Sequence, residues 1–268
     1  MEFQYSAKGT INSNGGIAIN ISNNNTDKTK EKAEQLENAN SELRAFNYII
    51  SHEVKAPVRA IDGYARIFIE DYEKEISKEG IELIKNIRHI CSDTLVLVNK
   101  LLEYIKLADK EPAKEVINLE QLIQDTFKDL LIGYTNKEKV QLKFKNKLPN
   151  ILGDKILMKQ VICNTISNAL KFTGNKKLAI ISIGYSFECN EHKFYIKDNG
   201  AGFNMEFSEN IFEMFTRMHS ESEFEGSGIG LAIVKKIIQK FGGRVWITGK
   251  VGKGACIYFT ISEENILK

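Results

Sequence analysis

The segment that decides the fold reads Ser51-His52-Glu53-Val54-Lys55-Ala56-Pro57. It lies inside a long helical pattern in which apolar residues recur every three to four positions. With roughly 100° of rotation per residue and Ile50 as origin, the apolar positions fall within roughly 40°, whereas His52 falls at about 200°. The pattern therefore excludes a core histidine and predicts an exposed His52 beside the Glu53 carboxylate. The apolar positions are Leu36, Leu43, Phe46, Val54, Pro57, Ile61 and Phe68.

Residues 51–57 resemble the phosphoacceptor box of sensor histidine kinases, which follows the pattern Ser-His-(Glu/Asp)-x-x-x-Pro. The likeness continues from Pro57 to Tyr64, and this extension is most similar to the phytochrome-like, PAS-linked soluble subgroup. The resemblance implies that His52 accepts a phosphoryl group and that Glu53 assists as the second catalytic residue. From spacing alone, a solvated surface histidine is the commoner interpretation. The motifs in the rest of the chain are therefore needed to choose between a surface histidine and a phosphoacceptor.

The composition is that of an ordinary soluble protein. The chain has 268 residues, 43% hydrophobic and 27% charged, with a net charge of +2. This length suits two modest domains, and the charge gives no reason to expect nucleic acid as a partner. No apolar run reaches the roughly eighteen residues of a membrane span, and residues 1–5 do not resemble a secretory signal. We therefore expect a cytoplasmic protein, or the soluble part of a longer sensor.

The four cysteines do not indicate a metal centre. They are widely separated, without a Cys-x-x-Cys pair or the Cys/His spacing that zinc requires. Scattered cysteines of this kind are typical of reduced core residues. We interpret them, with His89, His192 and His219, as structural or surface residues.

The sequence divides into three parts. Residues 1–25 carry glycines, asparagines and one alternating strand pattern at Ile17, Ile19 and Ile21, a weak likeness to the exit of a PAS sensor domain. Residues 26–110 are helical and residues 111–268 alternate strand and helix patterns. We predict a multidomain chain, with an all-α helical hairpin followed by an α+β two-layer sandwich.

The helical part carries two long apolar stripes. A first helix reaches about Tyr72, Gly80 marks a turn, and a second helix runs from about Ile81 to Leu107. Two such helices cannot bury their stripes alone, so we expect a homodimer with a four-helix bundle. The alternative is a hairpin that packs on its own C-terminal domain.

In the C-terminal part, strand patterns at 140–144, 178–187, 193–197, 244–248 and 255–261 alternate with helical patterns at 119–131, 154–171 and 230–241. One of these helices presents a polar stripe. Gln160, Asn164, Asn168 and Lys171 share one face, at spacings of four, four and three residues. An amide oxygen suits Mg²⁺ and a lysine suits phosphate, although a solvated helix face is the alternative.

Two glycine-rich segments follow. Asp198-Asn199-Gly200-Ala201-Gly202 comes after a strand, and Gly226-Ser227-Gly228-Ile229-Gly230-Leu231 opens a helix, where backbone amides face anions. The second segment matches neither the Rossmann nor the Walker A pattern. Between the two lies Phe212-Glu213-Met214-Phe215-Thr216-Arg217, whose aromatic residues would anchor a loop and whose Arg217 would reach phosphate.

In this order, behind His52, these motifs resemble the N, G1, F and G2 boxes of histidine kinases, which form the Bergerat ATP-binding fold. The resemblance covers about residues 36–261. It implies that ATP and Mg²⁺ bind here, with Asn168 as the metal ligand and Asp198 on adenine. By the same likeness Lys171 and Arg217 face the phosphates. Asn164 and the glycines complete the cofactor-binding set: Gly200, Gly202, Gly226, Gly228 and Gly230.

The expected activity is therefore ATP-dependent phosphorylation of His52, followed by transfer to an aspartate in the receiver domain of a response regulator. ATPase relatives carry a glutamate at the position of Asn164, and an amide is no general base, so Asn164 favours transfer over hydrolysis. Relatives with phosphatase activity carry Thr or Asn where this chain has Ala56, so we expect weak phosphatase activity. A scaffold pseudokinase and a plain ATPase remain the alternatives.

Overall fold

The computed structural model describes residues 6–11, 17–22, 53–107, 113–132, 134, 137–208, 210–216, 224 and 226–267. The chain separates into two compact units, Met1–Ala56 and Pro57–Lys268. In the first unit, β1 (Ser6–Ile11) and β2 (Ile17–Ser22) form an antiparallel hairpin with Ile11 opposite Ile17. The strand expected at 17–21 is thus present, and β1 was not expected. The helix predicted before residue 51, with Leu36, Leu43, Phe46 and Ile50, lies outside the described residues.

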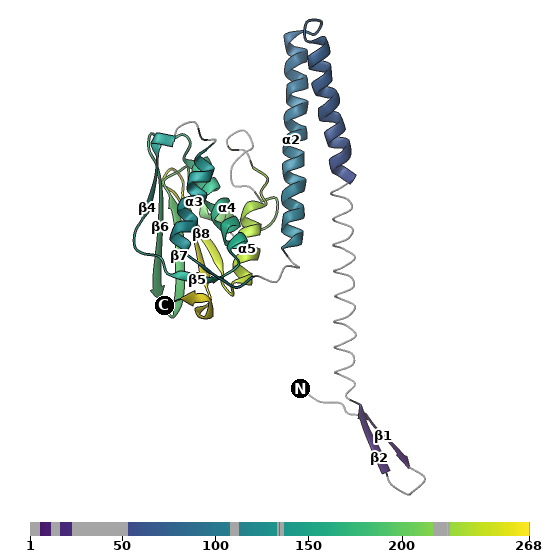
Figure 1. Cartoon of the computed structure of the whole chain (residues 1–268), viewed down its shortest axis with the longest axis vertical. Coiled ribbons are helices and arrows are strands. Elements are labelled where there is room, and N and C mark those ends of the chain that lie inside the picture. The colour runs from purple at the N-terminus through teal and green to yellow at the C-terminus, as the bar shows by residue number, and fades with distance from the viewer. Residues whose placement is uncertain are drawn as a thin grey trace. The chain divides into compact units, whose positions relative to one another are not determined.

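The second unit begins with a helical hairpin. Its first helix is described over residues 53–72, and residues 57–72 of this helix belong to the second unit. Its partner α2 (Lys78–Lys106) runs antiparallel beside it (Figure 1). Arg88 of α2 donates a hydrogen bond to Asp62 across the hairpin, at 2.9 Å. Gly80 does not mark the turn as predicted, because the Ser77 side chain caps α2 by accepting from the Gly80 amide. The turn therefore lies earlier, before Ser77.

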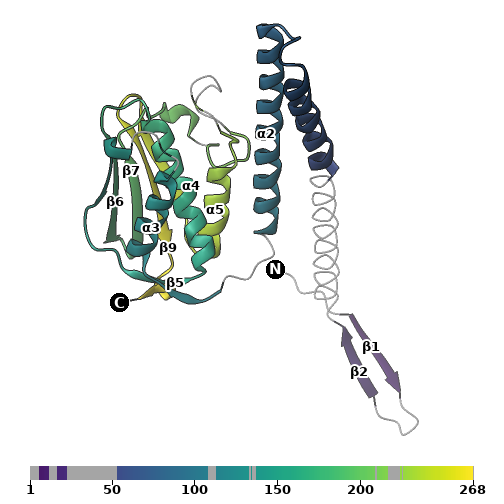
Figure 2. The same ribbon diagram turned by 45° about the horizontal axis from the view of Figure 1, so that its top comes forward.

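The C-terminal part is an α+β sandwich, as expected. Five strands have the order β4-β6-β7-β9-β8, with β4 and β6 parallel and the other pairs antiparallel. Figures 1 and 2 show α3, α4 and α5 together on one face of this sheet. The strands are β4 (Val140–Phe144), β6 (Ala179–Glu188), β7 (Glu191–Asp198), β8 (Val245–Lys250) and β9 (Gly254–Ile261), and the helices are α3 (Leu119–Leu131), α4 (Lys155–Thr173) and α5 (Gly230–Lys240).

Three short strands form a second, antiparallel sheet with the order β10-β5-β3. They are β3 (Glu115–Ile117), β5 (Asn150–Gly153) and β10 (Ile266–Leu267). Short 3-10 turns complete the fold: η1 (Lys137–Lys139), η2 (Met205–Phe207) and η3 (Glu263–Asn265). The sequence patterns predicted none of these short elements.

The alternation of buried and more exposed residues along β7 shows which way the Asp198 side chain faces. Phe194, Ile196 and Asp198 are buried on the face that carries the helices, while the residues between them are more exposed. Because side chains alternate along a strand, Asp198 must share the inner face with Phe194 and Ile196. On α4 the apolar face packs into the same core, which leaves Asn164, Asn168 and Lys171 half-buried beside it.

The start of α4 is fixed by a buried acid. Asp154 is 1% exposed and caps α4, where it accepts hydrogen bonds from the amides of Ile156 and Leu157 at 2.9 and 3.0 Å. Its second oxygen accepts from the Ala113 amide at 3.3 Å. These bonds satisfy helix-end amides that would otherwise lack partners. They set the position of the whole polar stripe of α4.

Candidate active site

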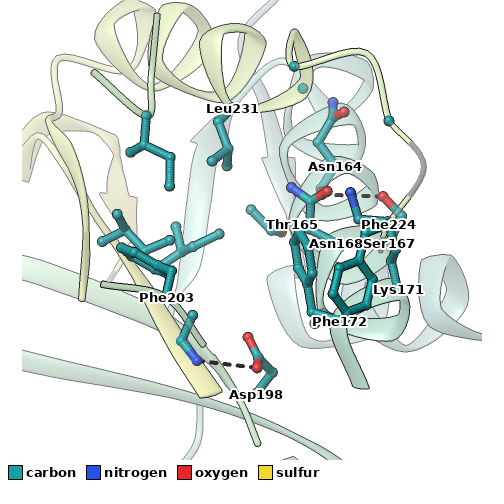
Figure 3. A pocket seen from close by; sticks show the side chains of 18 of the residues that line it. Asn164, Thr165, Ser167, Asn168, Lys171, Phe172, Asp198, Phe203, Phe224 and Leu231 are labelled. Atoms are coloured by element: carbon teal, nitrogen blue, oxygen red, sulfur yellow. Dashed lines mark hydrogen bonds between the residues drawn. The ribbon is translucent and has the colours of Figure 1, made fainter. Parts of the chain in front are cut away.

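One pocket lies beside α4 and the inner face of the sheet, with a volume of about 250 Å³. This volume is slightly below the roughly 300–1,000 Å³ that is typical of small-molecule sites. One side is apolar and the other is polar (Figure 3). The apolar side includes Ile196, Phe203, Ile211, Leu231, Ile247 and Ile257, and the polar side includes Asn164, Asn168, Lys171 and Ser227.

Asp198 lies at the base of the pocket, at the end of β7. Its Oδ1 accepts hydrogen bonds from the amides of Gly200, at 2.7 Å, and Ala255, at 3.2 Å. Figure 3 shows its other oxygen directed into the pocket. Burial raises the pKa of the Asp198 carboxyl, and the two amides and the Lys176 ammonium oppose this effect. One oxygen therefore remains to accept a hydrogen bond from a ligand.

Close backbone packing holds the segment after Asp198 in place. The amide of Ala201 donates to the Phe172 carbonyl of α4 at 3.0 Å, and its own carbonyl accepts from Gly252 at 2.6 Å. Gly202 has a φ of +63°, and a Cβ there would overlap the Lys250 carbonyl. Only glycine fits such a position. The predicted Gly200 is not part of the pocket wall, and it acts from behind through its bond to Asp198.

The amides of α4 face the start of α5. Asn164 Nδ2 donates to the Gln160 carbonyl at 3.0 Å, which turns its Oδ1 toward Gly230. A Cβ on Gly230 would lie 2.9 Å from that oxygen, so the glycine permits the approach. Asn168 lines the pocket one turn further along α4. These two amide oxygens suit a hard cation.

The polar end of the pocket carries donors for an anion. Lys171 Nζ lies 3.1 Å from the point where a Gly226 Cβ would be, and 4.3 Å from the centroid of the Phe172 ring. Helix α5 starts at Gly230, and its N-cap residue, Ile229, makes no side-chain capping bond. Its first amides are therefore available to an anionic group. Ser227 Oγ is buried without a partner in the same wall.

The segment 212–216 behaves differently from the prediction. Phe212 packs with Phe203, Ile211 and Ile247, as an anchor should. Phe215 is 55% exposed with a φ of +65°, so its ring anchors nothing in the core. Its amide instead donates to the Gly228 carbonyl at 3.0 Å, which ties this segment to the second glycine-rich segment.

The structure gathers most of the predicted residues in one place. The pocket is lined by Asn164, Asn168, Lys171, Asp198, Gly202, Gly226, Gly228 and Gly230. Glu53 is exposed on its helix, whereas His52 and Arg217 lie outside the described residues.

The pocket also has lining residues that were not expected. Among them are Phe203, Ser227 and Phe224, whose ring meets Phe172 edge-on at 5.0 Å between centroids. Inward alternation along β8 and β9 would have given Ile247 and Ile257. No sequence signal marks Phe203 or Phe224.

Within the described part of the chain, no cluster of three or more His, Cys, Asp or Glu residues could hold a metal. A cation at this site would depend on amide oxygens and on the ligand itself. The helices among the described residues are also not long and apolar enough to cross a membrane.

Comparison with known proteins agrees with this site. A family model for histidine kinase-, DNA gyrase B-, and HSP90-like ATPases matches residues 153–265, which include α4, both glycine-rich segments and α5. Cyanobacterial phytochrome B of Nostoc sp. is 32% identical over 231 residues, covering 85% of this chain and 30% of that protein. The adaptive-response sensory kinase SasA of Thermosynechococcus vestitus is 27% identical over 225 residues, covering 80% and 58%.

A solved structure, ShkA full-length in complex with AMPPNP, superposes with a TM-score of 0.60 at 24% identity. It covers 83% of this chain and 46% of that one, and likeness at this level concerns the fold. The chain spans 30% to 33% of the three cyanobacterial phytochromes that it matches. These findings confirm the predicted family: the chain belongs to the sensor histidine kinases, and residues 153–265 are its ATPase domain of the histidine kinase, DNA gyrase B and HSP90 type.

Proposed function

We propose that this chain binds ATP in the pocket described, phosphorylates His52, and passes the phosphoryl group to an aspartate in the receiver domain of a response regulator. The observation that carries the proposal is the polarity of one pocket. A buried acceptor, Asp198, lies at its apolar end, and amide and ammonium donors lie at the other. Adenine presents an amino donor and apolar faces, and a triphosphate presents anionic oxygens.

The apolar end of the pocket suits adenine, because one oxygen of the Asp198 carboxylate already has its hydrogen-bond partners. Two backbone amides hold one oxygen, so the other is oriented before a ligand arrives. Phe203, Ile247 and Ile257 give the flat ring an apolar surface. A guanine would place a carbonyl oxygen against the carboxylate, which is unfavourable. The pocket therefore favours adenine nucleotides.

The phosphate end suits an anion with a hard cation. Asn168, with Asn164 beside it, would hold Mg²⁺ through an amide oxygen, and the bound ion supplies neutralisation of phosphate charge. Lys171 and the first amides of α5 would orient the phosphate oxygens. By family likeness Arg217, Gly226 and Gly228 belong to the same end. Asn164 cannot act as a general base for water.

The acceptor chemistry rests on His52. A neutral imidazole nitrogen attacks the γ-phosphorus, the bond to the β,γ-bridging oxygen breaks, and ADP leaves. An ordinary histidine pKa near 6.5 leaves the ring mostly neutral at pH 7. Glu53 follows directly in sequence and would hold the other ring N–H as positive charge develops. The expected weak phosphatase activity rests on Ala56, which offers no polar group to orient a water.

The proposed assembly is a homodimer through the hairpin, residues 26–110, ahead of the catalytic part, 111–268. Each helix of the hairpin uses part of its apolar face internally and exposes the adjoining part. Ile61 is 49% exposed and Phe68 is 48% exposed on one helix, and Ile87 is 43% exposed on the other. A second copy that covers this surface would complete a four-helix bundle. Residues 1–25 would then lead from a sensory part.

Labelling with γ-³²P-ATP tests the proposal. Wild-type protein should acquire acid-labile, base-stable label, and His52→Ala should acquire none while its ATP affinity stays within a factor of a few. His89→Ala is the matched control, because His89 is another exposed helical histidine and should not affect labelling. Label that persists in His52→Ala refutes the acceptor. Unlabelled wild type indicates a scaffold, and free phosphate without labelled protein indicates an ATPase.

A further inference from the structure

The outer face of the five-stranded sheet carries a row of three aromatic side chains. Tyr195 of β7 lies opposite Tyr258 of β9, which lies opposite Trp246 of β8. Neighbours along these strands, such as Phe194 and Phe259, face the helices, and side chains alternate along a strand, so the row faces away from the helices. Because α3, α4 and α5 all lie on the other face (Figures 1 and 2), the partly exposed row is open to a binding partner.

Contacts within the row hold these rings in place. Trp246 and Tyr258 stack with their centroids 5.3 Å and their planes 8° apart, and the Arg244 guanidinium lies 4.5 Å from the Trp246 centroid. The Tyr195 ring covers Gly184, where a Cβ would overlap it. Side chains that are ordered in advance lose little entropy on binding, and Trp, Tyr and Arg often dominate the energy of protein interfaces. The row therefore suits a protein partner better than a nucleobase, which would need free ring faces.

Cations surround the row and give this outer sheet face a net charge of +3. Its charged residues are Lys143, Lys193, Lys197, Arg244 and Lys250, with Glu188 and Glu191 as the acids. Both acids are already bound: Lys193 Nζ lies 2.6 Å from Glu188 Oε2, and Arg244 Nη2 lies 2.6 Å from Glu191 Oε2. Within the described part of the chain, Lys143, Lys197 and Lys250 have no ion pair. The face therefore favours an anionic partner.

The tip of the helical hairpin, residues 70–82, has the opposite charge. Its charged residues are all exposed and sum to a net charge of −4: Glu70, Asp71, Glu73, Lys74, Glu75, Lys78, Glu79 and Glu82. Glu70 pairs with Arg66 of its own helix at 3.9 Å, and the other acids have no ion pair among the described residues. Tyr72 is 46% exposed, and Leu83, which directly follows the tip, is 64% exposed. The hairpin tip thus combines carboxylates with an accessible apolar surface.

We propose that the outer sheet face binds the hairpin tip of a second copy of this chain. The carboxylates of the tip meet Lys143, Lys197 and Lys250, and Tyr72 packs on the aromatic row. The chain's own tip does not reach this face, because α2 packs on α5, which covers the other side of the sheet. The two surfaces differ, so the contact is heterologous and can continue from copy to copy. It uses neither the nucleotide pocket nor the hairpin surface proposed for dimerisation.

Light scattering on the full chain at low salt and at about 1 M salt tests the contact, since the higher concentration screens charges beyond about 3 Å. At low salt the mass should rise with protein concentration above its value at high salt. The face variant Lys143→Glu/Lys197→Glu and the tip variant Glu73→Lys/Glu75→Lys should each weaken this association at least about ten-fold. A mixture of the two variants should associate again, because the basic face of the tip variant can bind the acidic tip of the face variant.

Two further measurements locate the contact. The control Lys114→Glu/Lys128→Glu changes the net charge equally, at exposed lysines outside the outer sheet face, and should associate as the wild type does. Trp246 is the only tryptophan of the chain, so its fluorescence reports on this face. Acrylamide should quench Trp246 less in the associated wild type than at high salt, and the tip variant should show no such protection. All variants change exposed residues and should melt at the wild-type temperature.

Several results would overturn the proposal. The first is an equal mass of the wild-type chain at both salt concentrations. Full association of the face or tip variant does the same, and so does a mixture of the two that stays apart. Equal weakening in the control would show that only net charge matters. Finally, a thymidine oligonucleotide that protects Trp246 while the wild-type chain stays unassociated would make nucleic acid the occupant of this face.

Discussion

Replacement of Asp198 by asparagine should separate ligand recognition from folding at this residue. Its Oδ1 accepts from the amides of Gly200 and Ala255, and an asparagine oxygen can keep both bonds. An alanine would leave the buried Gly200 amide and the part-buried Ala255 amide unpaired, and the buried amide alone costs about 1–3 kcal/mol. That is a large part of the stability of a typical domain. The asparagine variant is therefore the informative one.

The effect on stability follows from the pKa of Asp198. Burial raises this pKa above its ordinary value of 3.8, so the folded state holds the proton to higher pH than the unfolded state does. As pH rises through the window from 3.8 to the raised value, the carboxyl lowers the free energy of unfolding. Asparagine does not titrate. At pH 7 the Asp198→Asn protein should match or exceed the wild type in free energy of unfolding, measured by urea titration.

The effect on binding should be opposite in sign. If the asparagine oxygen stays with the backbone amides, its NH₂ group faces the pocket and meets the amino group of adenine. Two facing donors should cost about 1–3 kcal/mol, or roughly 5- to 150-fold in ATP affinity. The guanine carbonyl can instead accept from that NH₂ group. The affinity ratio of ATP to GTP should fall at least about ten-fold in calorimetric titrations.

Two results would refute this reasoning. If Asp198→Asn unfolds at a lower urea concentration than wild type at pH 7, the carboxylate stabilises the fold in a way that its hydrogen bonds with the Gly200 and Ala255 amides do not explain. If ATP and GTP weaken equally, Asp198 does not read the base.

Two further changes test the hairpin. Ile61→Glu should shift the dimer toward monomer in light scattering. Dimerisation would bury the exposed half of each Ile61 side chain, which contributes about 1 kcal/mol, and an unpaired buried charge costs several kcal/mol more. Lys85→Glu, on the opposite side of α2 from Ile87, is its control, and equal dissociation of both would argue against the bundle. Ala56→Thr should shorten the lifetime of the phosphorylated regulator, with labelling of His52 little changed and a helix cost of a few tenths of a kcal/mol. Rapid dephosphorylation by the native Ala56 chain would count against that reading.

Much of the catalytic fold could be predicted because its elements are long and periodic. The patterns predicted α3 and β4 with the bounds observed, and α4 within one or two residues. The strands β3, β5 and β10 were missed, since two to four residues are too few to show alternation. Their pairing depends on contacts between distant parts of the chain. Gly80 was misread because serine caps outweigh a single glycine in the first helical turn.

The site shows the same division. The stripe of Asn164, Asn168 and Lys171 could be predicted, because helical geometry places those positions on one face. Phe215 could not, since its exposure and positive φ arise from the pairing with Gly228. Ser227 was passed over for its glycine neighbours, because only coordinates reveal that a hydroxyl lacks a partner. The sequence therefore predicted which residue types the site contains. It did not predict which of their polar groups have a hydrogen-bond partner inside the protein.

The backbone packing around Gly202 has a consequence for inhibition. The wall beside Asp198 consists of main-chain segments that meet without intervening side chains, at Gly202 against Lys250 and at Gly254 against Asp198. A side chain at either glycine would overlap a carbonyl, so the chain has few substitutions that reshape this wall and still fold. A competitive inhibitor that rests on this wall and bonds to Asp198 would leave the protein little room for resistance mutations.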